Sequence, residues 1–140
     1  MARGSPDWKP WQTIQRFSEV GGAVPYEQKI TTSSSADGVT PATSTQDIVM
    51  EKGFVSHVWI RFPQGPVGLY SIAIFDAATQ LWPGAAGSFF TGDNEVIAFD
   101  VEYDVPLVLA QYKLTIHGSN LDDAYEHSAL VRIWVVKLPA

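Results

Sequence analysis

The sequence predicts an all-β protein, an antiparallel β-sandwich of jelly-roll type with seven or eight strands and an extended N-terminal arm. Three observations support this prediction. Beyond residue 25, apolar and polar residues alternate with a period of two in several segments, as in strands with one buried face. Glycine, proline and aspartate separate these segments. No pattern with the 3.6-residue period of a helix continues beyond the first 25 residues.

Length and composition indicate one folded domain with an acidic surface. The chain has 140 residues, of which 46% are hydrophobic and 17% charged, so it can bury a core of its own. Its formal net charge is -6, and a field of that sign repels phosphate backbones and anionic lipid surfaces. We therefore expect neither a nucleic-acid partner nor a membrane partner.

The chain contains no cysteine, which excludes disulfides, thiolate metal sites and a cysteine nucleophile. It also lacks an apolar run long enough for a signal peptide or a membrane-spanning helix. We expect a soluble protein without a secretion signal, whose stability comes from packing or assembly.

Residues 1–25 are predicted to form an arm, and residues 26–140 the sandwich domain. Prolines and glycines interrupt any regular pattern in the arm, yet it carries four large apolar side chains, Trp8, Trp11, Ile14 and Phe17. Three alternatives remain open: the arm covers its own core, docks on a neighbouring subunit, or is disordered. In the second case these four residues form an interface.

The first two predicted strands, 26–35 and 42–50, are rich in threonine and serine and flank a turn signal at Asp37 and Gly38. We expect both at sheet edges. The next strand, 54–62, alternates between two faces. Its mainly apolar face should point into the core (Phe54, Ser56, Val58, Ile60 and Phe62), and the other should point outward (Val55, His57, Trp59 and Arg61).

Further strands are predicted at 68–76, 80–82, 94–104, 111–118 and 128–137. The last of these is apolar on most of both faces, which places it centrally in a sheet. From these patterns we expect nine side chains to be largely buried: Val58, Ile60, Phe62, Ile97, Phe99, Leu114, Ile116, Val131 and Ile133.

No diagnostic catalytic motif is present, so we predict no enzyme activity, no catalytic residue and no cofactor. His57, His117 and His127 lack the close spacing of metal ligands. Carboxylates gather in two loops, around Asp93 and around Asp122, where solvated turn acids are the simplest interpretation. A calcium site or a catalytic carboxylate pair are the alternatives there.

Three tryptophans outside the arm are candidates for an interface or for stacking on a ligand. Trp59 and Trp134 fall on strand faces that should point outward, and Trp82 lies beside a proline–glycine turn. A large apolar side chain in such a place is covered by another part of the chain, contacts a neighbouring subunit or binds a sugar ring.

Six runs occur in a distinctive order: VWIRFPQGPVGL from Val58, AIFD from Ala73, QLWP from Gln80, GDNEVI from Gly92, YKLTI from Tyr112 and NLDDAYEH from Asn120. In this order they resemble small β-proteins encoded in structural-gene regions of tailed phages and related elements, including thermophilic ones. The likeness covers residues 27–136 and leaves out the arm. These proteins resemble head decoration or cement proteins, which bind the outside of a capsid lattice, often as trimers.

The resemblance implies a non-catalytic virion protein on the capsid exterior, which self-associates, with a homotrimer as the expected form. Its implied partner is the major capsid protein of a virus. Two alternatives remain open: a tail or head-fibre component, and a carbohydrate-binding module that stacks sugars on Trp59, Trp82 or Trp134.

Overall fold

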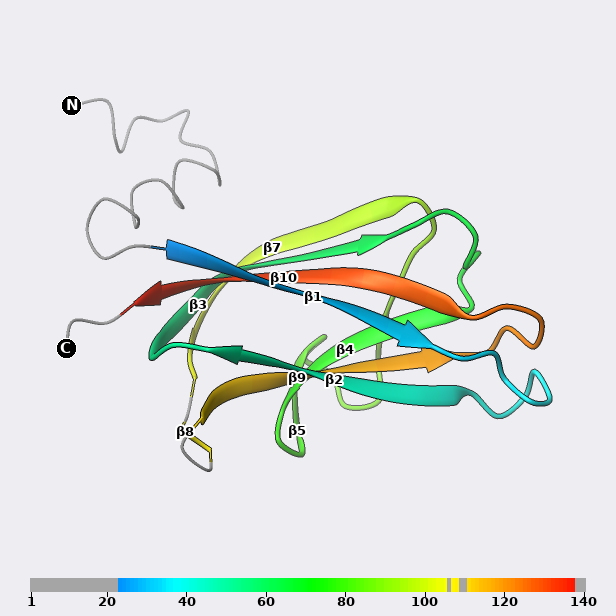
Figure 1. The fold of residues 1–140 in the computed structure, drawn as a ribbon, viewed down its shortest axis with the longest axis horizontal. Coiled ribbons are helices and arrows are strands. Elements are labelled where there is room, and N and C mark those ends of the chain that lie inside the picture. Colours follow the sequence, from blue (N-terminus) through cyan, green and yellow to red (C-terminus); the bar gives the residue numbers. More distant parts are fainter. Residues whose placement is uncertain (1–22, 106, 109–110, 138–140) are drawn as a thin grey trace.

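The computed structural model describes residues 23–105, 107–108 and 111–137, which form two facing antiparallel sheets (Figure 1). In the described residues no helix is long and apolar enough to span a membrane. The ten strands are β1 (Ala23–Thr32), β2 (Ala42–Met50), β3 (Gly53–Phe62), β4 (Tyr70–Asp76), β5 (Thr79–Trp82), β6 (Phe90–Thr91), β7 (Glu95–Asp104), β8 (Leu107–Val108), β9 (Gln111–Asn120) and β10 (His127–Lys137).

The strand order confirms the predicted jelly-roll sandwich. Sheet A has the order β1-β10-β3-β7, and sheet B has the order β2-β9-β4-β5, with β6 added to β4 and β8 added to β9. Every strand pair is antiparallel. The chain crosses between the sheets repeatedly, so that neighbours within a sheet are not consecutive, as in a jelly roll.

The eight strands of four or more residues follow the alternating segments closely, and β2 has the predicted bounds. The two-residue strands β6 and β8 are additional, because alternation cannot be recognised over two residues. As predicted, the threonine-rich β1 and β2 lie at sheet edges and the apolar β10 lies inside sheet A. Pro25, where the arm was expected to end, is the third residue of β1 and pairs with Trp134.

The core lies between the sheets, and seven of the nine side chains predicted to be buried are fully buried there. The exceptions are Ile97 and Phe99, which are half-buried against the core. Both belong to β7, the last strand of sheet A, whose outer side has no described strand beside it. An alternating pattern identifies the inner face of a strand but not its place in the sheet.

One face assignment is wrong because β3 contains a β-bulge. The pairing of β3 with β7 shifts between Val55 and His57, and its pairing with β10 shifts between Trp134 and Val135. The extra residue in β3, Ser56, exchanges the faces of the residues before it. Val55 therefore enters the core with 0% exposure, whereas Phe54 is half-buried and does not join the core cluster.

Hydroxyl groups from three strands meet inside the sandwich. Thr32 Oγ1 lies 2.9 Å from Tyr70 Oη and 2.5 Å from Ser44 Oγ, which joins β1 to β2 and β4. Gly118 of β9 faces this group, and a Cβ there would lie 2.6 Å from Thr32 Oγ1 and 2.8 Å from Tyr70 Oη. The glycine therefore provides the space in which the hydroxyl groups pair.

Candidate interaction surface

The outer face of sheet A brings together charged and aromatic side chains from four strands. The strand register places Arg132 of β10 between Glu27 of β1 and Trp59 of β3. One row along the sheet, it places Trp134 next to His57, and His57 next to Asp100 of β7. We call these six residues the arginine cluster (Glu27, His57, Trp59, Asp100, Arg132 and Trp134).

Arg132 holds the cluster together. Its Cζ atom lies 4.6 Å from the centroid of the Trp59 ring and 5.5 Å from that of Trp134, within the range of cation–π attraction. Its Nε and Nη2 atoms both donate to Glu27 Oε1, at 3.1 and 2.7 Å. The side chains of Arg132 and Glu27 are 36% and 42% exposed, so water screens this ion pair.

His57 supports the same cluster from the neighbouring row. Its Nδ1 atom lies 2.7 Å from Asp100 Oδ1, and its ring meets that of Trp134 edge-on at 5.2 Å. His57 is only 8% exposed, although it sits on the outer face of the sheet. Both tryptophans are half-buried. The cluster is thus a packed structure on the sheet face, with its side chains fixed before any partner binds.

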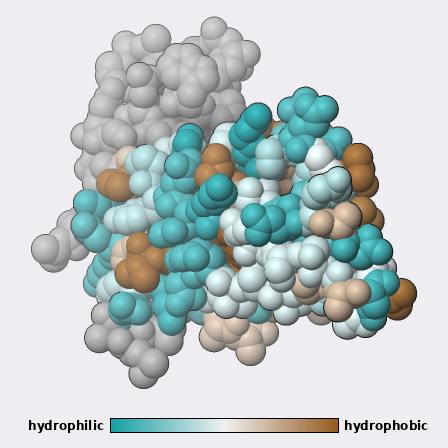
Figure 2. All heavy atoms as spheres, turned by 45° about the vertical axis from the view of Figure 1, so that its right-hand side comes forward, coloured by the Kyte–Doolittle hydropathy of each residue, from teal (hydrophilic) through white to brown (hydrophobic). Residues whose placement is uncertain are grey.

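A cavity of about 340 Å³ adjoins this face, lined by Lys29, Arg61, Pro63, Ser128, Ala129 and Leu130. Lys29, Leu130 and Arg61 form the row of sheet A next to that of Glu27, Arg132 and Trp59. The two basic side chains that line the cavity make it positively charged, whereas the net charge of the chain is negative. Figure 2 shows apolar residues as separate patches on the side of the molecule that it presents, among hydrophilic residues.

Two of the three candidate tryptophans lie together in the structure, and the third lies elsewhere. Trp59 and Trp134 share Arg132. Trp82 belongs to β5 of sheet B, and its ring packs edge-on against Phe99 at 6.2 Å and Tyr103 at 5.8 Å. The four candidate residues of the arm, Trp8, Trp11, Ile14 and Phe17, lie outside the described residues.

The sequence did not reveal Arg132 as the centre of the cluster, Glu27 as the partner of Arg132, or Asp100 as the partner of His57. One signal was present: an arginine stands between Leu130 and Trp134 on one face of the most apolar strand. The partners carried no such signal, because the pairing of β10 with β1, and of β3 with β7, joins residues far apart in the chain.

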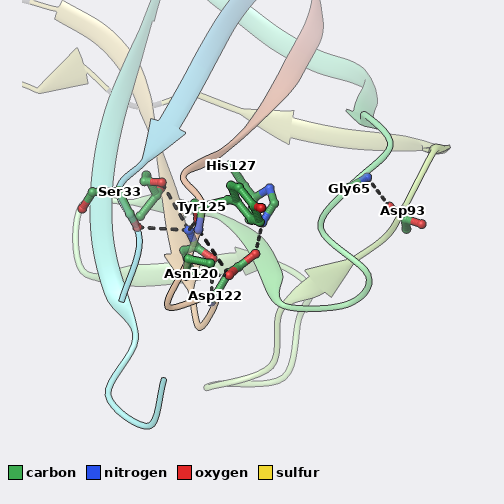
Figure 3. A network of polar contacts seen from close by, with 9 residues as sticks. Ser33, Gly65, Asp93, Asn120, Asp122, Tyr125 and His127 are labelled. Atoms are coloured by element: carbon green, nitrogen blue, oxygen red, sulfur yellow. Dashed lines mark hydrogen bonds and ion pairs between the residues drawn. The ribbon is translucent and has the colours of Figure 1, made fainter. Parts of the chain in front are cut away.

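One carboxylate in each acidic loop, Asp93 or Asp122, is held by hydrogen bonds within the chain (Figure 3). Asp122 Oδ1 accepts from the backbone of Ala124 at 2.9 Å, and its Oδ2 lies 2.7 Å from His127 Nε2. Asp93 Oδ1 accepts from Gly65 N at 2.7 Å. In the described part of the chain, no group of three or more His, Asp or Glu side chains is arranged to hold a metal ion. This geometry favours the turn-acid interpretation of both loops.

Asn120 connects the Asp122 loop to the end of β1. Its Nδ2 atom donates to the carbonyl oxygens of Ser33 and Tyr125, both at 3.0 Å, and its Oδ1 accepts from Asp122 N at 2.9 Å. Asn120 is fully buried, and Asp122 is 9% exposed. The network therefore fixes the loop between β9 and β10 against the chain that follows β1.

The Asp122 network predicts a dependence of stability on pH. Hydrogen bonds from the backbone of Ala124 and from His127 hold the pKa of Asp122 below its ordinary value of 3.8. A carboxyl group with a lowered pKa stabilises the folded state above its ordinary pKa, and this contribution is lost as the pH falls through the lowered value. We expect Asp122→Asn to be less stable than the wild type near neutral pH, and the difference to shrink below pH 3.8.

Urea unfolding across this pH range measures the difference, with Asp123→Asn as the matched control. Asp123 is its exposed neighbour in the same loop. A difference between Asp122→Asn and the wild type that stays constant down to the lowest pH would contradict this account.

Comparison with known proteins gives only distant structural likenesses. No protein-family model matches the chain, and no curated protein matches it. An Aeromonas sobria serine protease–chaperone complex is similar with 15% identity and a TM-score of 0.48, over 83% of this chain and 27% of that one. Tobacco streak virus coat protein is similar with 14% identity and a TM-score of 0.39, over 84% of this chain and 91% of that one.

A Bacillus endospore appendage that forms disulfide-linked pili is similar with 10% identity and a TM-score of 0.34, over 83% of this chain and 89% of that one. This chain thus spans about a quarter of the Aeromonas chain and most of the other two. With TM-scores below 0.5, none of these likenesses assigns a function. The fold assignment rests on the strand order described above.

Proposed function

We propose that this chain is a non-catalytic virion structural protein, a capsid decoration protein that binds the outside of a capsid lattice as a homotrimer and stabilises it. The observation that carries the proposal is the arginine cluster on the outer face of sheet A. Arginine and tryptophan are the residue types most enriched among the residues that dominate binding energy at protein interfaces. Here one arginine is held against two tryptophans on an ordered sheet.

The arginine cluster is suited to binding because its side chains are already held in position. A partner does not have to immobilise Arg132, because Glu27 and the two indole rings already position it, so little rotamer entropy remains to be lost. The adjoining cavity, with Lys29 and Arg61, fits an acidic side chain of a partner.

The arm has a defined role in this proposal. A capsid presents many identical sites, so a small protein gains avidity when it self-associates and reaches adjacent subunits. We propose that Trp8, Trp11, Ile14 and Phe17 dock on a neighbouring subunit. The net charge of -6 suits the exterior of a shell better than contact with a packaged genome.

Carbohydrate binding is the second candidate, because Trp59 and Trp134 lie on the outer face of the sheet. Sugar rings stack on the open faces of aromatic rings. The Arg132 guanidinium already lies over both indole rings. This contact favours a protein partner, and a glycan array with the full chain tests the alternative directly.

Light scattering and cosedimentation test the proposed function. We expect a particle three times the 15.3 kDa chain mass, which cosediments with shells assembled from the major capsid protein of the same genome. We expect Arg132→Ala to weaken shell binding by roughly 30-fold, which corresponds to about 2 kcal/mol. The matched control is Lys52→Ala, which removes one exposed positive charge from the loop between β2 and β3 and leaves both the Arg132 contacts and the basic cavity in place.

A wild-type protein that stays monomeric and does not cosediment would contradict the proposal. Equal shell affinity of Arg132→Ala and wild type would remove the arginine cluster as its basis, provided that the melting temperatures show both to be folded.

A further inference from the structure

Among the described residues, the outer edge of β7 is a long, open sheet edge. β7 ends sheet A, and β3 is the only described strand that pairs with it (Figure 1). It runs for ten residues, Glu95–Asp104. A strand in this position presents a row of backbone N–H and C=O groups that a further strand can use.

The sandwich is also open along this side. The inner side chains of β7 are Ile97, Phe99, Val101 and Tyr103, and all four are half-buried, in contrast to the fully buried inner residues of β3 and β10. Among the described strands, β7 pairs with none of sheet B, so side-chain contacts join the two here. The ring of Trp82 lies 6.2 Å from that of Phe99, and the ring of Phe90 lies 5.5 Å from it. The inner side chains of β7 are therefore partly exposed beside the backbone groups with which no described strand pairs.

The opposite edge of sheet A is protected, whereas the β7 edge is not. β1 carries Pro25, which has no N–H group to offer, and Lys29 on its outer face, and its inner residue Ile30 is 2% exposed. Proline and lysine are the common means by which proteins block pairing at an edge. β7 contains neither.

The charges along β7 determine which kind of strand can pair with its outer edge. The outer face of β7 carries Asp100, Glu102 and Asp104, Glu95 stands at its start, and no lysine or arginine occurs in the strand. Like charges directly opposite each other destabilise a strand pair, so two copies of β7 should not pair with each other. Basic side chains in the same positions would be attracted.

We infer that the β7 edge binds an extended peptide segment in which basic residues alternate with apolar ones. The segment adds to sheet A as a further strand, as in β-strand addition to an exposed sheet edge. Its apolar side chains continue the inner row of Ile97 and Phe99, and its basic side chains face Glu102 and Asp104 on the outer side. This site is separate from Arg132, so its test does not depend on binding to a shell.

Amide hydrogen exchange of the full chain tests this inference. The probe is a capped peptide of alternating lysine and valine, about nine residues long, which at roughly 3.3 Å per residue matches the β7 edge. We expect the peptide to slow exchange in residues 95–104 by about tenfold or more and to leave residues 23–32 unchanged. A peptide with the same sequence, N-methylated at every residue, keeps the charge and side chains but loses all its backbone donors, and should not protect β7.

A charge-reversal variant, Glu102→Lys with Asp104→Lys, tests the choice of partner. Neither side chain belongs to the arginine cluster, since the contact to His57 comes from Asp100. We expect the variant to bind the lysine–valine peptide about tenfold more weakly and to gain binding to a glutamate–valine peptide.

Three results would overturn the inference. They are equal binding of the N-methylated peptide, protection of residues 23–32 in place of 95–104, and protection, in the protein without any peptide, of those β7 amides that do not bond to β3. The last result would mean that another part of the chain or a second copy already occupies the edge.

Discussion

Gly118→Ala should lower the free energy of unfolding by about 3 kcal/mol, because overpacking and unmade buried hydrogen bonds each cost about 1–3 kcal/mol. The new methyl group would lie 2.6 Å from Thr32 Oγ1, 2.8 Å from Tyr70 Oη and 3.2 Å from Ile30 Cδ1. These side chains are at most 2% exposed, so they cannot move into solvent. The hydrogen bond between Thr32 and Tyr70 has to break, or the two sheets have to separate locally.

Chemical unfolding measures this loss, and Gly84→Ala is the matched control. A Cβ at Gly84 would meet only Leu81 O, at the ordinary distance of 3.9 Å, and this glycine does not have a positive φ. We expect the control to change the free energy of unfolding by less than about 0.5 kcal/mol. Equal stability of Gly118→Ala and Gly84→Ala would mean that the hydroxyl group cluster has room that the structure does not show.

Phe62→Ala should cost about 3–5 kcal/mol, as expected for a large aromatic side chain truncated in a packed core. Phe62 has 0% exposure at the end of β3, and its ring meets that of Tyr70 edge-on at 6.4 Å. Its removal leaves a cavity between the sheets that the surrounding backbone cannot close.

Phe99→Ala is the matched comparison, because the sequence pattern places both phenylalanines on inner strand faces. Phe99 is half-buried at the open side of the sandwich, where water already reaches part of its ring. We expect its truncation to cost roughly half as much, about 2 kcal/mol. Equal losses for the two variants would contradict the open side of the sandwich and weaken the case for the β7 edge as a binding site.

Much of the fold could be predicted because it depends on local alternation. Along β7, β9 and β10, and along β3 from Val58 onward, the residues that alternate in the sequence also alternate between the core and the outer face. A strand with one buried face imposes that pattern on its own sequence, since successive side chains point to opposite sides. The threonine-rich composition of β1 and β2 likewise indicated their edge positions, because edge strands tolerate polar residues.

The bulge at Ser56 shows where local pattern fails. One residue of β3 that is extra relative to β10 exchanges the faces of Phe54 and Val55, and its direct neighbours Val55 and His57 are not residues that mark a bulge. Two partner strands, β7 and β10, absorb the shift, so its cause lies in the pairing of three strands and not in β3 alone.

The candidate surface, too, could be predicted only in part. The sequence by itself determined that Trp59 and Trp134 lie on outer strand faces, because each is flanked by residues that must point into the core. Only the tertiary structure decided that both meet Arg132, that Glu27 anchors it, and that Trp82 lies elsewhere. The period of a strand fixes the direction of each side chain, whereas strand order and register, which join residues distant in the chain, decide the neighbours that it meets.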